Sequence, residues 1–186
     1  MKIRQLFLKN EEGGALIESA ITLPVLILII SGIFEFCNYS LINNKLVRAT
    51  GVLGDMVSRQ NLTRANLIAL MQTVDVIMIP YNKNQQIRVV VSHISNKGAT
   101  TDPAKMTITW QQQVNGATSN FGAAGSLPKN LPNNITVLSD QAIIVTEVFF
   151  NYTPIVFQGF YGATTLYKTS VYVPRVGNMT TLLGGG

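Results

Sequence analysis

The chain has 186 residues, of which 47% are hydrophobic and only 12% are charged, and its formal net charge is +5. This length suits one membrane segment followed by one modest soluble domain. The lysines and arginines after residue 80 are scattered along the sequence, so the positive charge gives no support to nucleic-acid binding. A single cysteine excludes an internal disulfide, and one histidine with one cysteine argues against a zinc site with several protein ligands.

The longest apolar run of the chain begins at Gly14. Between Glu18 and Glu35 lie sixteen residues without any charge. An α-helix rises about 1.5 Å per residue, which separates these two carboxylates by roughly 26 Å along the axis. Because the hydrocarbon core of a bilayer is about 30 Å thick, we expect residues 14–36 to form a transmembrane helix. A cleaved secretory signal fits less well, since its apolar region has only about 7–15 residues.

Two residues of this run are unusual for a membrane helix. A carboxylate inside a membrane costs about 2.5–3.5 kcal/mol, so Glu18 either lies solvated at the level of the headgroups or has a specific partner. Pro24 removes one backbone hydrogen bond and tends to kink a helix. We expect a kink there, which neighbouring groups in a membrane can accommodate.

The residues before the apolar run have a characteristic order. A polar and mostly charged leader, residues 1–13, ends in two glycines that break the chain, and Glu18 follows at the fifth place after Gly13. This order resembles a type IV prepilin processing site. The resemblance implies that a prepilin peptidase cuts between Gly13 and Gly14, or alternatively after Gly14, and that the apolar helix stays on the mature protein. Glu18 would then lie near a new α-amino group, its own or that of a neighbouring subunit, and opposite charges attract strongly at low dielectric.

The helical pattern continues beyond the apolar run. Apolar residues recur three and four positions apart, which predicts one long helix over residues 15–59. Thr63 is a suitable N-cap for a second helix over residues 64–74. Residues 37–80 therefore form an amphipathic helix and a second helix. Cys37 is expected to be a buried free thiol that faces other helices, with intermolecular pairing or lipid attachment as alternatives.

From residue 81 the periodicity changes to alternation, which indicates a β-rich domain over residues 81–176. Its strands are predicted at residues 86–95, 105–112, 141–152 and 166–173, with the first two in an antiparallel hairpin. The segment 115–134 is rich in Gly, Ala, Ser, Asn and Pro, and we expect a mobile, exposed loop there. The tail, residues 177–186, is expected to be flexible.

Neither of the two most conspicuous titratable residues of the β-rich domain predicts catalysis. His93 lies in a strand, where a core or surface role is favoured over a ligand role. Glu147 lies in an apolar strand and more often marks a polar face, although it can also be a buried acid. No Gly-x-Ser-x-Gly motif is present. We expect no catalytic residue, no metal site and no cofactor.

Several segments together resemble one known family. Residues 13–24, with Gly32 and Glu35, are similar to the N-terminal signature of TadE-like proteins, which are minor pseudopilins of the tight-adherence (Tad/Flp) pilus system. The later segments that look similar to the periplasmic part of that family are residues 55–60, 107–110, 147–154 and 173–175.

The resemblance implies an α+β, pilin-like fold, in which a long N-terminal transmembrane helix continues into a periplasmic helix packed on a small antiparallel β-sheet. It implies a non-enzymatic minor pseudopilin of the bacterial inner membrane, with its N-terminus in the cytoplasm and its C-terminal domain in the periplasm or in the pilus. Its partners would be the prepilin peptidase, other pilin-like subunits, inner-membrane assembly proteins and the bilayer. The alternative is a membrane-tethered extracytoplasmic binding or adhesin domain with an uncleaved signal anchor.

Overall fold

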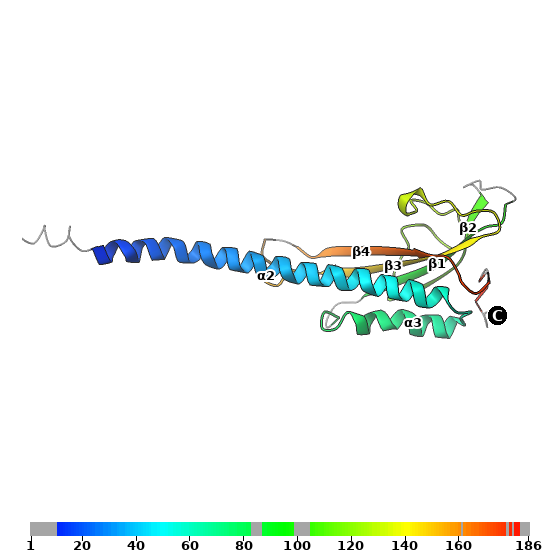
Figure 1. Ribbon diagram of the computed structural model, residues 1–186, viewed down its shortest axis with the longest axis horizontal. Helices are drawn as coiled ribbons and strands as arrows, with labels where there is room; N and C mark the ends of the chain where they lie inside the picture. Colours follow the sequence, from blue (N-terminus) through cyan, green and yellow to red (C-terminus); the bar gives the residue numbers. More distant parts are fainter. Residues whose placement is uncertain are drawn as a thin grey trace, which may run out of the picture.

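The computed structural model describes residues 11–82, 87–98, 105–160, 162–177, 179 and 181–182. Figure 1 shows an elongated molecule in which one helix, α2 (Glu11–Ser58), runs along most of the length and the other elements lie along its C-terminal half. These elements are α3 (Arg64–Ile77), β1 (Arg88–Asn96), β2 (Met106–Val114), the 3₁₀ helix η2 (Pro132–Asn134), β3 (Ala142–Tyr152) and β4 (Thr164–Tyr172). The fold is therefore α+β, with a long N-terminal apolar helix and a small antiparallel sheet, as the sequence predicts.

The start of α3 follows from local sequence. The Thr63 side chain accepts a hydrogen bond of 3.2 Å from the backbone N–H of Asn66, which confirms Thr63 as the N-cap of α3. The described part of α2 starts at Glu11, and the two glycines at 13 and 14 are helical within it and do not break the chain. Of the expected leader, residues 1–10 lie outside the described residues.

The four strands form one antiparallel sheet in the order β2-β1-β3-β4. The predicted hairpin is confirmed, because β1 pairs with β2, with a register shift between His93 and Ile94. The two central strands are buried almost throughout, whereas the edge strands β2 and β4 are half-exposed. Both faces of the central strands must therefore be covered.

One face of the sheet is covered by helices and the other by an irregular segment. The α2 and α3 helices pack on the first face, where the largest cluster of buried apolar side chains lies. On the second face Phe121, Leu131 and Val137 are buried against side chains of β1, β2 and β3. The expectation of an exposed, mobile loop over residues 115–134 is thus wrong for Phe121 and Leu131, because the outward apolar side chains of the central strands need a cover.

The α2 helix approaches β4 closely at Gly54. A Cβ atom added there would lie 2.7 Å from Ser170 Oγ and 2.7 Å from the Tyr172 ring, so any side chain would force a shift. At Gly51 the nearest atom to an added Cβ is the Tyr172 hydroxyl oxygen at 3.7 Å, an ordinary contact. Gly54 is therefore the position at which the absence of a side chain sets the distance between helix and sheet.

Part of the predicted tail packs on the domain. Met179 is buried, and its backbone carbonyl accepts a hydrogen bond of 2.8 Å from the Trp110 indole N–H. Leu182 packs against the same core. Residues 178, 180 and 183–186 lie outside the described residues, as does Tyr161.

Candidate functional site

The N-terminal part of α2 projects from the domain and is exposed along its length (Figure 1). It contains a stretch that is long and apolar enough to cross a membrane, and none of this stretch is buried inside the molecule. Its large exposed apolar side chains are Leu16, Ile17, Ile21, Leu23, Val25, Leu26, Ile27, Leu28, Ile29, Ile30, Ile33 and Phe34. Exposed apolar surface of this extent is unfavourable in water, so another apolar phase or another protein has to cover it.

All of the site residues predicted from the sequence lie on this projecting helix. Gly13 and Gly14 are in its first turns, and an added Cβ on Gly14 would have no atom within 4 Å. The Glu18 side chain is exposed beside a shallow hollow of about 400 Å³ that Thr22 also lines. Pro24 lies within the continuous helix. The structure thus places these residues on the part of α2 that lies away from the sheet, and Gly14, Glu18 and Pro24 are exposed there. The processing site, the role of Glu18 and the kink stay predictions.

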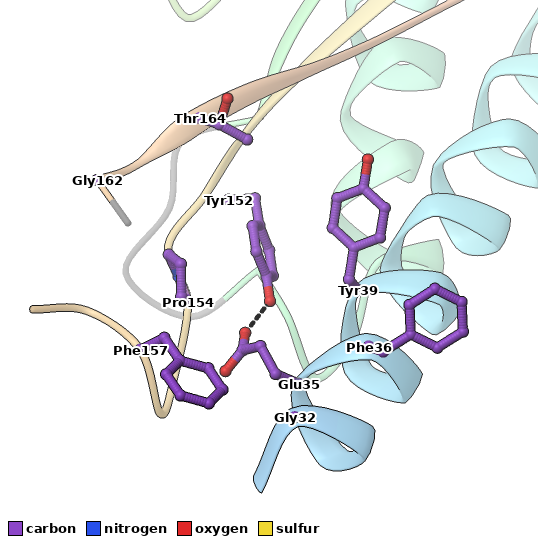
Figure 2. Close-up of a pocket in the computed structure, with 9 residues that line it drawn as sticks. All are labelled: Gly32, Glu35, Phe36, Tyr39, Tyr152, Pro154, Phe157, Gly162 and Thr164. Carbon is purple, nitrogen blue, oxygen red and sulfur yellow. Dashed lines mark hydrogen bonds between the residues drawn. The ribbon is translucent and has the colours of Figure 1, made fainter. Parts of the chain in front are cut away.

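A second constellation lies where the apolar run meets the sheet, and we call it the Glu35 junction. The Glu35 carboxylate accepts a hydrogen bond from the Tyr152 hydroxyl, which Figure 2 shows. It also accepts hydrogen bonds from the backbone N–H groups of Ile155 and Val156, at 3.0 and 2.8 Å. Burial, followed by the hydrogen bond to Glu35, raises the pKa of Tyr152 to about 12, so its hydroxyl stays protonated and can donate at neutral pH. One carboxylate on α2 therefore holds the end of β3 and the loop after it.

The Glu35 junction borders a groove of about 460 Å³ between α2 and the β3–β4 connection. Figure 2 shows its walls, and the residues that line it are Gly32, Glu35, Phe36, Tyr39, Tyr152, Pro154, Phe157, Gly162 and Thr164. The rings of Tyr39 and Tyr152 meet edge to face with centroids 5.4 Å apart. The groove is mostly apolar, its walls are aromatic, and its one carboxylate is already hydrogen-bonded by the protein. Such a groove suits the binding of an apolar group better than the catalysis of a reaction.

The sequence alone did not pair these residues. Glu35 and the segment ending in Pro154 both belong to the resemblance to TadE-like proteins, yet nothing in either segment points to the other. They are more than a hundred residues apart in the chain, and only the antiparallel run of β3 along α2 brings them together.

A smaller contact fixes the opposite end of the sheet. Asp55 forms an ion pair of 2.8 Å with Arg59 and one of 3.4 Å with Arg175, and the Arg175 N–H donates to the Ser58 carbonyl at 2.7 Å. All three charged side chains are partly exposed, so each pair contributes little, about 0–1 kcal/mol. This contact orients the chain after β4 rather than stabilising the fold strongly.

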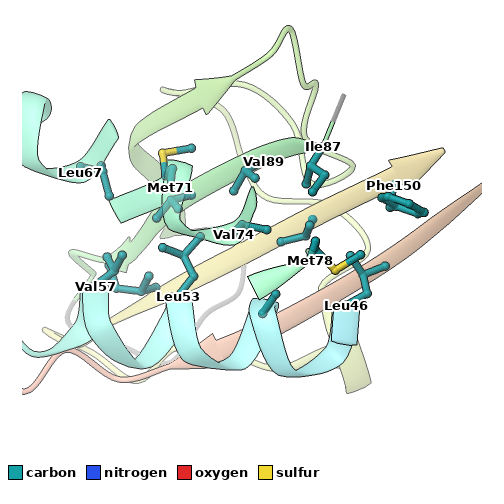
Figure 3. Packing of buried hydrophobic residues seen from close by; sticks show 14 of the residues in the cluster. Leu46, Leu53, Val57, Leu67, Met71, Val74, Met78, Ile87, Val89 and Phe150 are labelled. Carbon is teal, nitrogen blue, oxygen red and sulfur yellow. The ribbon is translucent and has the colours of Figure 1, made fainter. Parts of the chain in front are cut away.

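Between these two contacts, a tightly packed core prevents α2 from sliding along the sheet. Figure 3 shows side chains of α2 pointing between α3 and the strands. The buried side chains that it labels are Leu46, Leu53, Val57, Leu67, Met71, Val74, Met78, Ile87, Val89 and Phe150. Truncating one such leucine to alanine costs about 2–5 kcal/mol. The position of Glu35 along the helix relative to the sheet is therefore fixed by packing.

Glu147 proves to be the buried acid, and its alternative as a marker of a polar face is wrong. It is fully buried and accepts hydrogen bonds from the Ser119 hydroxyl, from the Asn120 N–H at 3.0 Å and from the Tyr167 hydroxyl at 3.0 Å. Burial raises the pKa of Glu147, although these hydrogen bonds oppose the rise. Burial, followed by the Glu147 charge, also raises the pKa of Tyr167. Glu147 thus attaches the covering loop to β3.

The other residues considered in the sequence are His93 and Cys37. His93 is fully buried and stacks on Trp110 with ring centroids 5.4 Å apart, which confirms a core role. Cys37 is exposed on α2, so the expectation that it faces other helices stays a prediction. Among the residues that the structure describes, no three His, Cys, Asp or Glu side chains lie close enough together to hold a metal ion.

Comparison with known proteins gives a match within α2. Residues 13–51 match the family model described as TadE-like protein. The chain carries a TadE-like segment. This segment contains Gly13, Gly14, Glu18, Pro24 and Glu35 and ends where α2 packs on the sheet. The comparisons with curated proteins and with solved structures found no match.

Proposed function

We propose that this protein is a non-enzymatic minor pseudopilin that is anchored in a membrane by α2 and takes part in the assembly of a Tad/Flp-type adhesion pilus. The observation that carries the proposal is the coincidence of the TadE-like segment with the exposed apolar helix. The matched segment, residues 13–51, includes the whole uncharged run of α2, which has no packing partner within the described protein, and continues into the part of α2 that is buried in the core.

The proposal gives each residue predicted from the sequence a role. A prepilin peptidase cuts between Gly13 and Gly14 and leaves α2 on the mature protein. Glu18, which is exposed on the projecting helix, then attracts an α-amino group of its own chain or of a neighbouring subunit. In the low dielectric of a membrane or of a packed helix bundle this attraction favours both ionised forms. Pro24 adjusts the direction of the helix between neighbouring subunits.

The placement in the cell follows from the same proposal. The mature N-terminus starts at the cytoplasmic side of the inner membrane, α2 crosses the membrane once, and the sheet lies in the periplasm or in the pilus. Other pilin-like subunits and inner-membrane assembly proteins cover the apolar surface of α2 when lipid does not.

The first test is the mature N-terminus of the protein, measured by mass spectrometry in cells with and without the prepilin peptidase. A start at Gly14 or Ala15 that depends on the peptidase supports the pseudopilin. An intact Met1 in both strains would instead support the alternative, a tethered binding or adhesin domain with an uncleaved anchor. Cleavage after residue 31 or 32 would remove the apolar helix and overturn both.

The second test concerns Glu18. In a pseudopilin, Glu18→Ala and Glu18→Gln should reduce piliation while the protein still reaches the membrane, because the charge that attracts the amino group is lost. Thr22→Ala, one turn further along the same exposed surface, is the matched control and should leave piliation intact. Normal pili in both Glu18 variants would remove the proposed role of this acid.

A further inference from the structure

The connection from β3 to β4 begins with an unusually apolar stretch, residues 153–160, which we call the apolar loop. It contains no charged residue. Phe160 is 86% exposed, Ile155 56% and Val156 44%. Single exposed apolar side chains are common on protein surfaces, but several on one short uncharged loop form a patch that calls for a partner.

The Glu35 junction fixes where this loop lies along α2. The backbone N–H groups of Ile155 and Val156 donate to the Glu35 carboxylate, and Gly32 of α2 and Phe157 of the loop line the same groove. Glu35 is also the residue that ends the uncharged run of α2. Since that run rises roughly 26 Å and a hydrocarbon core is about 30 Å thick, the loop lies level with the hydrocarbon boundary when α2 spans a bilayer.

The overall shape places the apolar loop nearest to that boundary. In Figure 1 the end of β3 and the start of β4 extend along α2 towards its N-terminal half, ahead of β1 and α3. The opposite end of the sheet, where Asn96 bonds to Asp140 and Gln141, points away from the projecting helix. The loop is therefore the part of the domain that meets the membrane surface first.

Three backbone N–H groups of the loop are paired within the protein. Unpaired backbone N–H groups are costly in lipid. Those of Ile155 and Val156 are paired with Glu35, and that of Phe160 donates to the Phe157 carbonyl at 2.9 Å. The rings of Phe157 and Phe160 lie 6.4 Å apart, edge to face, on this turn. The hydrogen-bond donors of the Glu35 carboxylate come from the protein itself, so this carboxylate does not rely on water alone for its hydrogen bonds.

We propose that the apolar loop inserts into the lipid interface beside α2, with Phe160, Ile155 and Val156 in contact with acyl chains just below the headgroups. This inference rests on the proposed anchoring of α2 in a membrane. Aromatic side chains are favoured at this depth of a bilayer. Insertion gives the domain a second point of attachment to the membrane and fixes the rotation of the whole molecule about the axis of α2, so the same face of the sheet is always presented to incoming subunits.

The test uses the full chain in vesicles of phosphatidylethanolamine and phosphatidylglycerol that carry a doxyl-labelled quencher lipid. In a Cys37→Ser background, a bimane fluorophore is attached through Phe160→Cys or, as a second site, Ile155→Cys. Leu138→Cys is the matched control, because Leu138 is 52% exposed at the opposite end of the sheet. Ile27→Cys, in the middle of the uncharged run, reports whether α2 itself is in the bilayer.

We expect strong quenching at residues 160, 155 and 27 and little at residue 138. Quenching at residue 27, with residues 160 and 155 as weakly quenched as residue 138, would overturn the insertion while the anchoring stands. Absence of quenching at residue 27 would overturn the anchoring itself. If the signal at residue 160 changes with the protein-to-lipid ratio but not with doxyl lipid, a second copy of the chain covers the loop, and the lipid contact is refuted.

Discussion

The Glu35 junction leads to the sharpest prediction, because Glu35 bonds directly to two backbone N–H groups whose exchange with solvent can be measured. Glu35→Ala removes the acceptor for Ile155 at 3.0 Å and for Val156 at 2.8 Å, together with the partner of the Tyr152 hydroxyl. The apolar side chains of α2 that hold it on the sheet, such as Leu46 and Leu53, are untouched by this change, and the buried Tyr152 loses only its hydrogen-bond partner. The loop should therefore open locally while the domain stays folded.

The expected size follows from the type of bond. A hydrogen bond to a charged group contributes about 1.5–3 kcal/mol, and the partial exposure of this site argues for the lower end of that range. Since 1.4 kcal/mol corresponds to a factor of ten, amide exchange at Ile155 and Val156 should accelerate about tenfold in Glu35→Ala. Tyr152→Phe removes only the hydroxyl donor, so its effect on these two amides should be smaller.

The assay is hydrogen–deuterium exchange, followed by mass spectrometry of the full chain in detergent micelles. Glu18→Ala is the matched control, because it deletes the same side chain from α2 at a position far from the loop, and it should leave both amides unchanged. Amides in the centre of β3, such as that of Val145, should exchange at the same rate in all variants. Unchanged exchange at Ile155 and Val156 in Glu35→Ala would refute the junction as the element that holds the loop.

Three further predictions concern the stability of the full chain in detergent, measured by urea unfolding. Gly54→Ala should lower the free energy of unfolding by about 1–3 kcal/mol through overpacking against β4. Gly51→Ala has room for its Cβ and should be neutral or stabilise α2 by up to about 1 kcal/mol. Equal effects of the two substitutions would contradict the close approach at Gly54. Burial raises the pKa of Glu147 above its ordinary value of 4.5, so at intermediate pH the native state binds more protons than the unfolded state. The stability that Glu147 contributes is fully present below pH 4.5 and is lost as the pH rises through the folded-state pKa. Glu147→Gln should flatten that decline, and an identical pH dependence in both proteins would count against a buried, proton-binding Glu147. Asp55→Asn should lower stability by less than about 1 kcal/mol, with the difference shrinking at high salt, because both of its ion pairs are partly exposed; a much larger loss would mean that this contact helps to hold the sheet on α2.

The helices and strands were predictable from the sequence because their signals are local. The change from a helical period to alternation after residue 80 marks where the sheet begins, and Thr63 identifies the start of α3 through its own side chain. The uncharged run between Glu18 and Glu35 likewise needs no tertiary information, since its length and composition alone suit a bilayer.

Burial of the irregular segments was not predictable in the same way. The composition of residues 115–134 is that of an exposed loop, yet Phe121 and Leu131 are buried in it. Whether such a loop packs depends on whether the sheet leaves an apolar face uncovered, which no local pattern encodes. The same holds for Glu147, whose surroundings consist of loop residues that precede it and of a tyrosine on the next strand.

The sequence by itself determined the type of molecule: a long apolar helix with an acid near its start, followed by a small antiparallel sheet. Only the tertiary structure decided which residues of the helix and of the sheet contact each other. The run of β3 along α2 carries Tyr152 and the apolar loop to Glu35, and the close approach at Gly54, together with the core around Leu53, fixes the height at which they meet. The physical reason is that helix and strand signals arise from neighbours within a few residues, whereas the junction joins groups more than a hundred residues apart, whose proximity exists only once the core has packed.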